Sequence, residues 1–311
     1  MNENADEPRP WLRTVSEECP VDPPQQAWIE ASMKWFTGEF GREPLLGGIV
    51  LPGPNLRSGY TGTPRQIERL IAGVCTVMSI DRSRLTVEYF DIREEDDPES
   101  RKGRRAVGHY FVRDGRPVIG LDVSEASDAD YLTAIIAHEL CHVRLLGERR
   151  ITRERRDHER LTDLLTVYFG FGIFSTNAAL RYGETARGFS VEPLGYLDER
   201  MLNAARNDGY SRVGYLTEPE FGYAMACYAW LREEADPAWA ARLDPGPRVH
   251  LRQGLAYLAR CARKGSLPTT RSGGISIAVR VRRPPSASSD GLRPPFPVFT
   301  RSAPPPAAPA R

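Results

Sequence analysis

One strongly apolar segment, residues 128–146, carries two histidines and a glutamate in its middle. Its apolar residues follow helical spacing, and Gly147 closes it. His138 and His142 are four residues apart, so a helix places both side chains on one face, with Cβ atoms about 6 Å apart. Buried ionisable groups are costly unless they are paired or bind a metal. The segment therefore predicts a buried helix whose polar face serves a specific site.

A second motif, ERLTD at residues 159–163, follows at a distance that lets a second helix return beside the first. Catalytic zinc takes three protein ligands, and two histidines with one glutamate are a known set. Glu159 can supply the glutamate. Asp163 lies one turn later on the same face, where it can accept the free ring N–H of a ligating histidine. The two motifs predict a metal site in a helix hairpin.

HELCH (138–142) and ERLTD together resemble the H-E-x-x-H…E-x-x-x-D signature of gluzincin metallopeptidases, the thermolysin-like clan of zincins. The resemblance implies a zinc-dependent peptidase with one Zn²⁺ per chain and a peptide or protein as substrate. It makes His138, His142 and Glu159 the zinc ligands, Glu139 the general base, and Asp163 the partner of His138. The chain also resembles bacterial proteins with the same H-E-x-x-H and LTDLLTV-like segments, which implies no particular substrate.

The sequences GHYFV and PVIGLDV flank Asp114-Gly115, a dipeptide that favours positive φ in a tight hairpin turn. We expect a hairpin over residues 106–123. Gluzincins pair an extended peptide with the edge strand of such a hairpin. The resemblance thus makes this edge strand Gly108, His109, Tyr110, Phe111 and Val112. The implied fold is α+β and zincin-like, a small twisted mixed sheet with its hairpin edge packed on the active-site helix, followed by a mainly helical C-terminal part.

Several assignments stay open from the sequence. His158 precedes Glu159 and is the alternative third ligand. Glu148 stands where metzincins have their third ligand, but Leu145 replaces the glycine that their turn needs. A donor to the transition-state oxyanion is expected beyond the second helix. Its candidates are Tyr215 and Tyr223 first, then Tyr182, Tyr196, Tyr210, Tyr228 and His250.

The pattern divides the chain into four parts. Residues 1–22 form a flexible lead-in, residues 23–126 an α/β part with the hairpin, and residues 127–263 a helical part with the zinc site. Residues 264–311 are rich in proline and arginine, a composition that favours disorder. Further helices are expected over residues 25–40, 64–79, 153–169, 217–232, 237–243 and 247–262, and strands over residues 47–51 and 84–90.

Charge and composition narrow the functional classes. The 311-residue chain has a net charge of +1, but residues 264–311 carry eight Lys/Arg against Asp290 alone. Few aromatic residues lie among those charges, which argues against nucleic-acid binding. Five scattered cysteines, no apolar leader and no run of about 18–20 apolar residues indicate a cytoplasmic protein without membrane contact. The alternative function is a non-catalytic, zinc-stabilised interaction module; the oligomeric state stays open.

Overall fold

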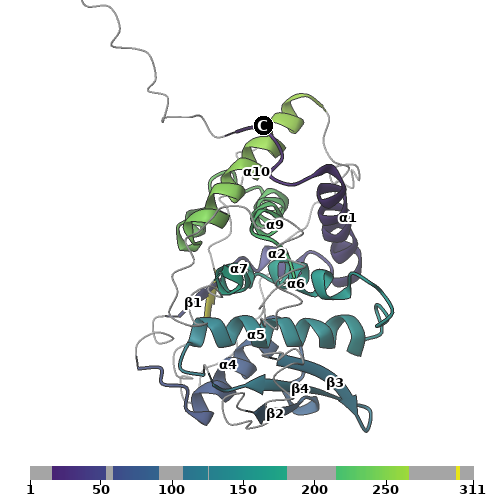
Figure 1. Ribbon diagram of the computed structural model, residues 1–311, viewed down its shortest axis with the longest axis vertical. Coiled ribbons are helices and arrows are strands. Elements are labelled where there is room, and N and C mark those ends of the chain that lie inside the picture. Colours follow the sequence, from purple (N-terminus) through teal and green to yellow (C-terminus); the bar gives the residue numbers. More distant parts are fainter. Residues whose placement is uncertain are drawn as a thin grey trace, which may run out of the picture.

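The computed structural model describes residues 16–53, 59–90, 108–124, 126–180, 215–265 and 299–301. Helix α5 (Ala129–His142) lies at the centre of the fold, between a small β-sheet and a group of helices (Figure 1). It packs against the sheet and α4 (Pro64–Val77) on one side. On the other side it packs against α6 (His158–Tyr168) and α7 (Gly172–Leu180). The helix that carries HELCH is therefore covered on both sides.

The sheet has three strands in the order β2 (Thr86–Phe90), β4 (Arg116–Asp122), β3 (Gly108–Arg113). β2 runs parallel to β4, and β3 runs antiparallel to it. The connecting turn has φ of 52° at Asp114 and 74° at Gly115, as a two-residue hairpin of this type requires. The predicted mixed sheet and hairpin are confirmed, and β3 forms one edge among the described strands.

Helix starts follow local sequence signals. α1 (Pro23–Phe40), α4 and α9 (Glu218–Leu231) each begin with a capping box, in which the cap side chain and a glutamine or glutamate three residues later bond each other's backbone N–H. Other helical elements are α2 (Glu43–Leu46), η1 (Arg82–Arg84), η5 (Ala238–Arg242) and α10 (Pro245–Arg263). Among the described residues, none of these helices combines the length and the apolar character that crossing a bilayer requires.

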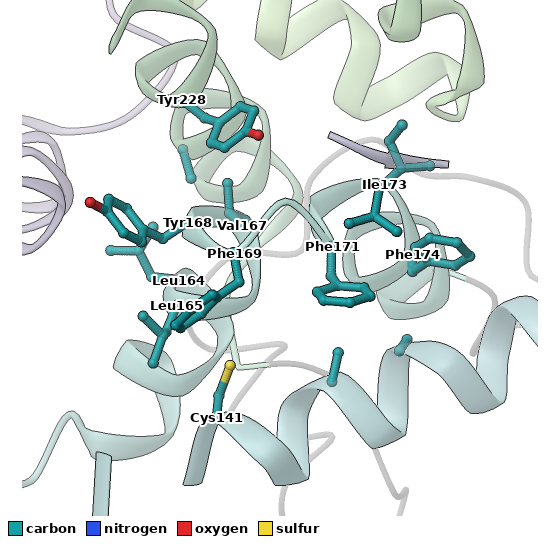
Figure 2. Packing of buried hydrophobic residues seen from close by; sticks show 14 of the residues in the cluster. Cys141, Leu164, Leu165, Val167, Tyr168, Phe169, Phe171, Ile173, Phe174 and Tyr228 are labelled. Carbon is teal, nitrogen blue, oxygen red and sulfur yellow. The ribbon is translucent and has the colours of Figure 1, made fainter. Parts of the chain in front are cut away.

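An aromatic core supports α6 and α7 above α5. Tyr168 and Phe169 at the end of α6 lie close to Phe171 and Phe174 at the start of α7, and Tyr228 reaches in from α9 (Figure 2). All five are buried. Cys141 of α5 is also fully buried, as expected for a small packing residue, and all five cysteines are free thiols. This packing fixes α6 relative to α5.

Two helix boundaries differ from the prediction. The α-helical part of the HELCH segment ends at His142 and continues as one wider π-helical turn, η3 (Val143–Gly147). The second helix begins at His158 instead of Arg153. The preceding turn is held by side chains: Arg155 Nε donates to Asp157 Oδ1 at 2.6 Å, and Trp28 Nε1 donates to Asp157 Oδ2 at 2.7 Å. A contact with distant α1 thus replaces the helix that local sequence favours.

The strand expected over residues 47–51 forms as β1 (Val50–Pro52), paired antiparallel with β5 (Phe299–Arg301). β5 belongs to the segment predicted to be disordered, so that prediction is wrong for these three residues. Phe299 is buried, with its ring 6.0 Å from Phe171 and 5.9 Å from Phe174. The buried Phe299 ring therefore stabilises a strand although the surrounding composition favours disorder. The rest of the segment after residue 265 lies outside the described residues.

Candidate metal centre

The structure brings three of the predicted site residues together. The ligand atoms of His138, His142 and Glu159 all lie within 4.8 Å of one another. Glu159 Oε2 is 3.3 Å from Nε2 of each histidine. The two imidazole rings, one helical turn apart on α5, are 4.9 Å apart at 83°. Two nitrogens and one carboxylate oxygen therefore converge on one point, an arrangement that can hold a divalent metal.

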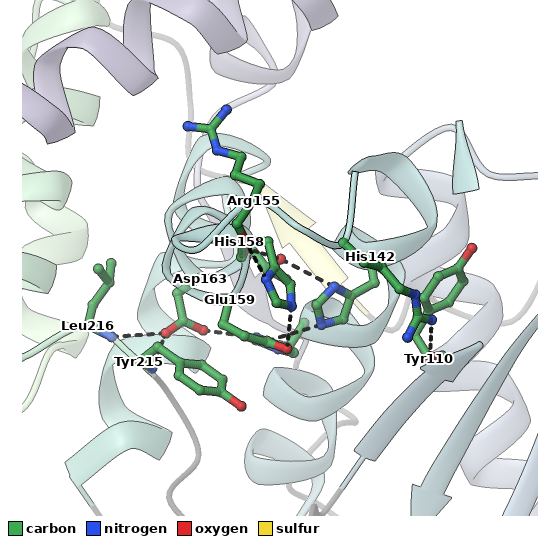
Figure 3. A network of polar contacts seen from close by, with 11 residues as sticks. Tyr110, His142, Arg155, His158, Glu159, Asp163, Tyr215 and Leu216 are labelled. Carbon is green, nitrogen blue, oxygen red and sulfur yellow. Dashed lines mark hydrogen bonds and ion pairs between the residues drawn. The ribbon is translucent and has the colours of Figure 1, made fainter. Parts of the chain in front are cut away.

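Asp163 orients the first histidine. Its Oδ1 lies 2.9 Å from Nδ1 of His138, while its Oδ2 accepts hydrogen bonds from the backbone N–H groups of Tyr215 and Leu216, the latter at 3.1 Å (Figure 3). Asp163 is 3% exposed, so these bonds are shielded from water. With the Nδ1 hydrogen held by Asp163, Nε2, which lies 3.3 Å from Glu159, is the nitrogen that can bind a metal once it loses its own proton. The geometry is the one that the resemblance implies for Asp163.

Thr162 gives the second histidine the same orientation, and the sequence reasoning missed it. Its hydroxyl donates to the backbone oxygen of His158 at 2.8 Å, and its oxygen lies 3.3 Å from Nδ1 of His142. Because the only hydroxyl hydrogen is already used, Thr162 can only accept from Nδ1. His142 therefore carries its hydrogen on Nδ1 and presents the lone pair of Nε2 to the cluster. No sequence signal marks this pairing, because Thr162 also fits an ordinary buried helix.

Neither alternative ligand belongs to the cluster of three. His158 Nδ1 is 2.9 Å from the backbone oxygen of Arg155, and its Nε2 lies 3.2 Å from Glu159 Oε1, whereas His138 and His142 contact Oε2. Glu148 forms ion pairs with Arg144 and with Arg150, at 2.9 Å from the latter. Geometry thus favours Glu159 over His158 as the third ligand and leaves Glu148 on the surface.

The Glu139 carboxyl group lies against the start of β3 and is not one of the three ligand groups. It is 5% exposed, and its Oε2 has no hydrogen-bond partner among the described residues. A Cβ placed on Gly108 would lie 2.5 Å from Glu139 Oε1, so the carboxyl group fits only because β3 begins with glycine. Burial raises the pKa of Glu139 to about 7; charged His138 opposes the rise and Glu159 adds to it.

Electrostatics couple the other members of the cluster. Burial acts to lower the pKa of His138, but hydrogen bonds to Asp163 and Glu159 outweigh it, and the pKa lies well above its ordinary value. Burial acts to raise the pKa of Glu159, but the two histidines hold it well below its usual range. Burial lowers the pKa of His142. In the metal-free protein a proton on His138 balances the Glu159 carboxylate, so a metal ion would compete with that proton.

The five predicted edge residues divide between the two faces of the sheet. Gly108 lies against Glu139, and the Tyr110 ring stacks on His142 at 5.9 Å and 18°. His109 stacks with Phe90 and Phe111 on the opposite face, at 5.2 Å and 5.6 Å. Val112 is 55% exposed. Only alternate residues of β3 therefore face the cluster of His138, His142 and Glu159.

Of the two leading oxyanion candidates, one contacts the cluster. The Tyr215 ring stacks on His138 at 6.0 Å and 22°. Tyr223 is fully buried, and its hydroxyl donates to Glu30 of α1 at 2.5 Å, which corrects its assignment to the site. Tyr228 is fully buried in the aromatic core, and Nε2 of His250 lies 3.8 Å from Oε1 of Glu218 on α9. The remaining candidates, Tyr182, Tyr196 and Tyr210, lie outside the described residues.

Comparisons with protein-family models, with curated proteins and with solved structures gave no match. The resemblance to gluzincins rests on the two motifs.

Proposed function

We propose that the chain is a zinc-dependent peptidase of zincin-like architecture that hydrolyses peptide bonds. The observation that carries the proposal is the convergence of His138, His142 and Glu159, whose ligand atoms lie within 4.8 Å of one another. A buried carboxyl group, Glu139, stands beside them without being one of them. A structural zinc site is normally closed by four protein ligands, and only three converge here among the described residues. A hydrolytic site also needs a general base, which Glu139 can supply.

The donor chemistry fits zinc. Two imidazole nitrogens and one carboxylate oxygen form a known catalytic zinc set that leaves a coordination position for a reactant. Asp163 and Thr162 hold the Nδ1 side of the two rings, which leaves both Nε2 atoms as acceptors for a cation. The thiol of Cys141 is fully buried, and burial raises its pKa well above its ordinary value, so it does not compete as a thiolate ligand.

Glu139 supplies the proton transfers. Bound zinc would polarise the scissile carbonyl and make a water molecule more acidic. The Glu139 carboxylate would accept a proton from the attacking water and, once protonated, donate it to the leaving amine. The second oxygen of Glu139 has no partner among the described residues, so no internal bond has to break first.

β3 supplies the binding edge. Residues that flank a two-residue hairpin turn form a hydrogen-bonded pair, and paired positions alternate from there. Gly108, Tyr110 and Val112 then fall at positions whose N–H and C=O groups point away from β4. Pro117, which lacks an N–H, faces Val112, as this alternation allows. An extended peptide could add to β3 as a further strand, with a peptide bond held near Glu139.

Tyr215 is the remaining candidate for a donor to the oxyanion. Its ring lies over His138, and its backbone N–H is held by Asp163. Tyr215 is 38% exposed, so the residue is partly open to solvent. Tyr215 therefore stays in the proposal as an electrostatic stabiliser of the transition state.

The test compares the wild type with Glu139→Gln. Gln keeps the shape but cannot accept the proton, so we expect each protein to hold about one zinc ion per chain. Peptide hydrolysis should fall by at least about 100-fold in the variant. Metal content by mass spectrometry and cleavage of a peptide library, measured on the same samples, check both points. A fully active variant contradicts the mechanism; zinc binding without cleavage by the wild type favours the non-catalytic module.

A further inference from the structure

One edge group of β3 is already occupied by an arginine. Arg153 Nη2 donates to the backbone oxygen of Tyr110 at 3.0 Å, and its guanidinium carbon lies 5.8 Å from the centre of the Tyr110 ring. Arg153 comes from the turn between η3 and α6 and is exposed. The contact shows directly that the Tyr110 carbonyl points away from β4, toward the position that an added strand would take.

Arg153 differs from the paired arginines around it. Arg150 forms ion pairs with Glu39 and Glu148, and Arg155 pairs with Asp157. Arg153 makes no ion pair with any carboxylate in the described part of the chain. A guanidinium group is always charged, and its planar set of N–H donors matches a carboxylate. The edge strand thus carries an unbalanced positive charge.

A cavity of about 460 Å³ opens where Arg153 meets β3. Residues 110–112 of β3, Leu146 and residues 151–153 line it. Most of this lining is apolar or aromatic, and Arg153 is its only charged member. The volume lies within the range of small-ligand pockets, so a peptide side chain or a chain end fits inside.

The strand geometry sets the distance from this cavity to the reacting groups. Gly108 lies against Glu139, Tyr110 stacks on His142, and the cavity continues to Val112. Two residues of an extended chain span roughly 7 Å. A peptide residue opposite Tyr110 or Val112 is therefore two to four residues from one opposite Gly108.

We propose that Arg153 binds a carboxylate of the substrate and selects peptides with an acidic group two to four residues from the cleaved bond. The inference rests on the proposed peptidase function. A peptide N–H that pairs with the Tyr110 oxygen replaces the Arg153 donor, and the released guanidinium pairs with the carboxylate in the cavity. An acidic side chain and a free C-terminus offer the same two oxygens, and experiment separates them.

The test uses the zinc-loaded full chain and two pairs of peptides. In the first pair, with amidated ends, one internal glutamate is exchanged for glutamine; in the second pair, without acidic side chains, a free C-terminus is exchanged for its amide. We expect kcat/KM to be about tenfold higher for the carboxylate member of at least one pair. Preference in the first pair identifies a side-chain carboxylate, and preference in the second alone identifies a chain end.

Variants connect the preference to Arg153. Arg153→Ala should reduce the ratio within the preferred pair to about one, and Arg153→Glu should favour a lysine-containing peptide. Arg156→Ala is the matched control, because Arg156 is an exposed arginine of the same turn without an ion pair among the described residues. Its ratio should equal that of the wild type. A wild-type ratio near one in both pairs, or an unchanged ratio in Arg153→Ala, overturns the inference.

A binding experiment separates this inference from the proposed function. Fluorescence anisotropy measures how the same peptides bind to Glu139→Gln and to the double variant Glu139→Gln/Arg153→Ala. Carboxylate-dependent binding that Arg153→Ala removes, without cleavage by the wild type, contradicts the peptidase and supports the role of Arg153. Cleavage without carboxylate preference contradicts the role of Arg153 alone. Peptides that are neither bound nor cleaved overturn both.

Discussion

The site has an α6 wall, formed by Thr162 and Asp163, and a β3 wall, formed by β3 together with Arg153, which contacts it. Thr162 and Asp163 are 0% and 3% exposed and are hydrogen-bonded to histidines. Val112 and Arg153 are exposed. The α6 wall is held by buried hydrogen bonds to side chains and to backbone. The β3 wall offers backbone groups and one charged side chain to solvent. Buried bonds cannot be replaced by water, while exposed bonds exchange readily. The first wall is therefore suited to hold an ion in fixed geometry, and the second to receive a chain that varies.

Asp163→Ala should give the largest change on the α6 wall. It removes the partner of His138 and leaves the backbone N–H groups of Tyr215 and Leu216 without their acceptor. We expect zinc affinity to fall by about 10–100-fold and stability to fall by about 1–3 kcal/mol for each N–H left unbonded. Competition with a chelator and chemical denaturation measure the two effects. Unchanged zinc affinity would show that Asp163 does not orient a ligand.

Glu139→Gln should stabilise the metal-free protein in a pH-dependent manner. Folding raises the pKa of Glu139 from its ordinary 4.5 to about 7, so the folded chain binds this proton more tightly than the unfolded chain does. The contribution of Glu139 to stability is therefore greatest below pH 4.5 and falls as the pH rises to about 7. The loss at about pH 8 amounts to at most about 3 kcal/mol.

Glutamine does not titrate, so the variant does not lose stability as the pH rises past the pKa of Glu139. In denaturation of chelator-treated protein, the variant should be more stable than the wild type at about pH 8, and the difference should shrink toward about pH 4. A gain of equal size at both pH values would mean that shape, and not the buried charge, is responsible. No gain at the higher pH would mean that the carboxylate is solvated.

Thr162→Val should give the smallest effect of the three, because the contact to His142 is a single bond between neutral groups. We expect zinc affinity to fall by about tenfold. Thr133→Val is a matched control: Thr133 is equally buried, and both hydroxyls donate to the carbonyl four residues earlier in their own helix. Chelator competition should separate the two variants, whose losses of stability should be similar. Equal zinc affinities would rule out an orienting role for Thr162.

Local chemistry accounts for what the sequence could predict. Asp114-Gly115 defines the hairpin because its two positive φ angles depend on those residues themselves. The start of α9 follows from Thr217 and Glu220, which bond each other's backbone. The spacing of HELCH sets two histidines on one helical face. Each of these features is decided within a few residues of chain.

Contacts between distant segments account for what could not be predicted. The hydrogen bond from Trp28 to Asp157 holds the turn before α6, so the helix begins later than predicted. The packing of Phe299 against Phe171 accompanies a strand in a segment whose composition predicts disorder. The pairing of Thr162 with His142 and the fit of Glu139 against Gly108 depend on how the helices and the sheet pack. The hydrogen bond from Arg153 to the Tyr110 oxygen belongs to the same class, because it joins a turn to β3.

The proposed function requires that His138, His142 and Glu159 together hold one zinc ion. X-ray absorption at the zinc edge of the purified, zinc-loaded protein tests it most directly, because the spectrum reports the ligand atoms themselves. We expect one zinc ion per chain, bound by two imidazoles and oxygen donors at about 2.0–2.2 Å. Absence of bound zinc, or a shell of sulfur at about 2.3 Å, would contradict it.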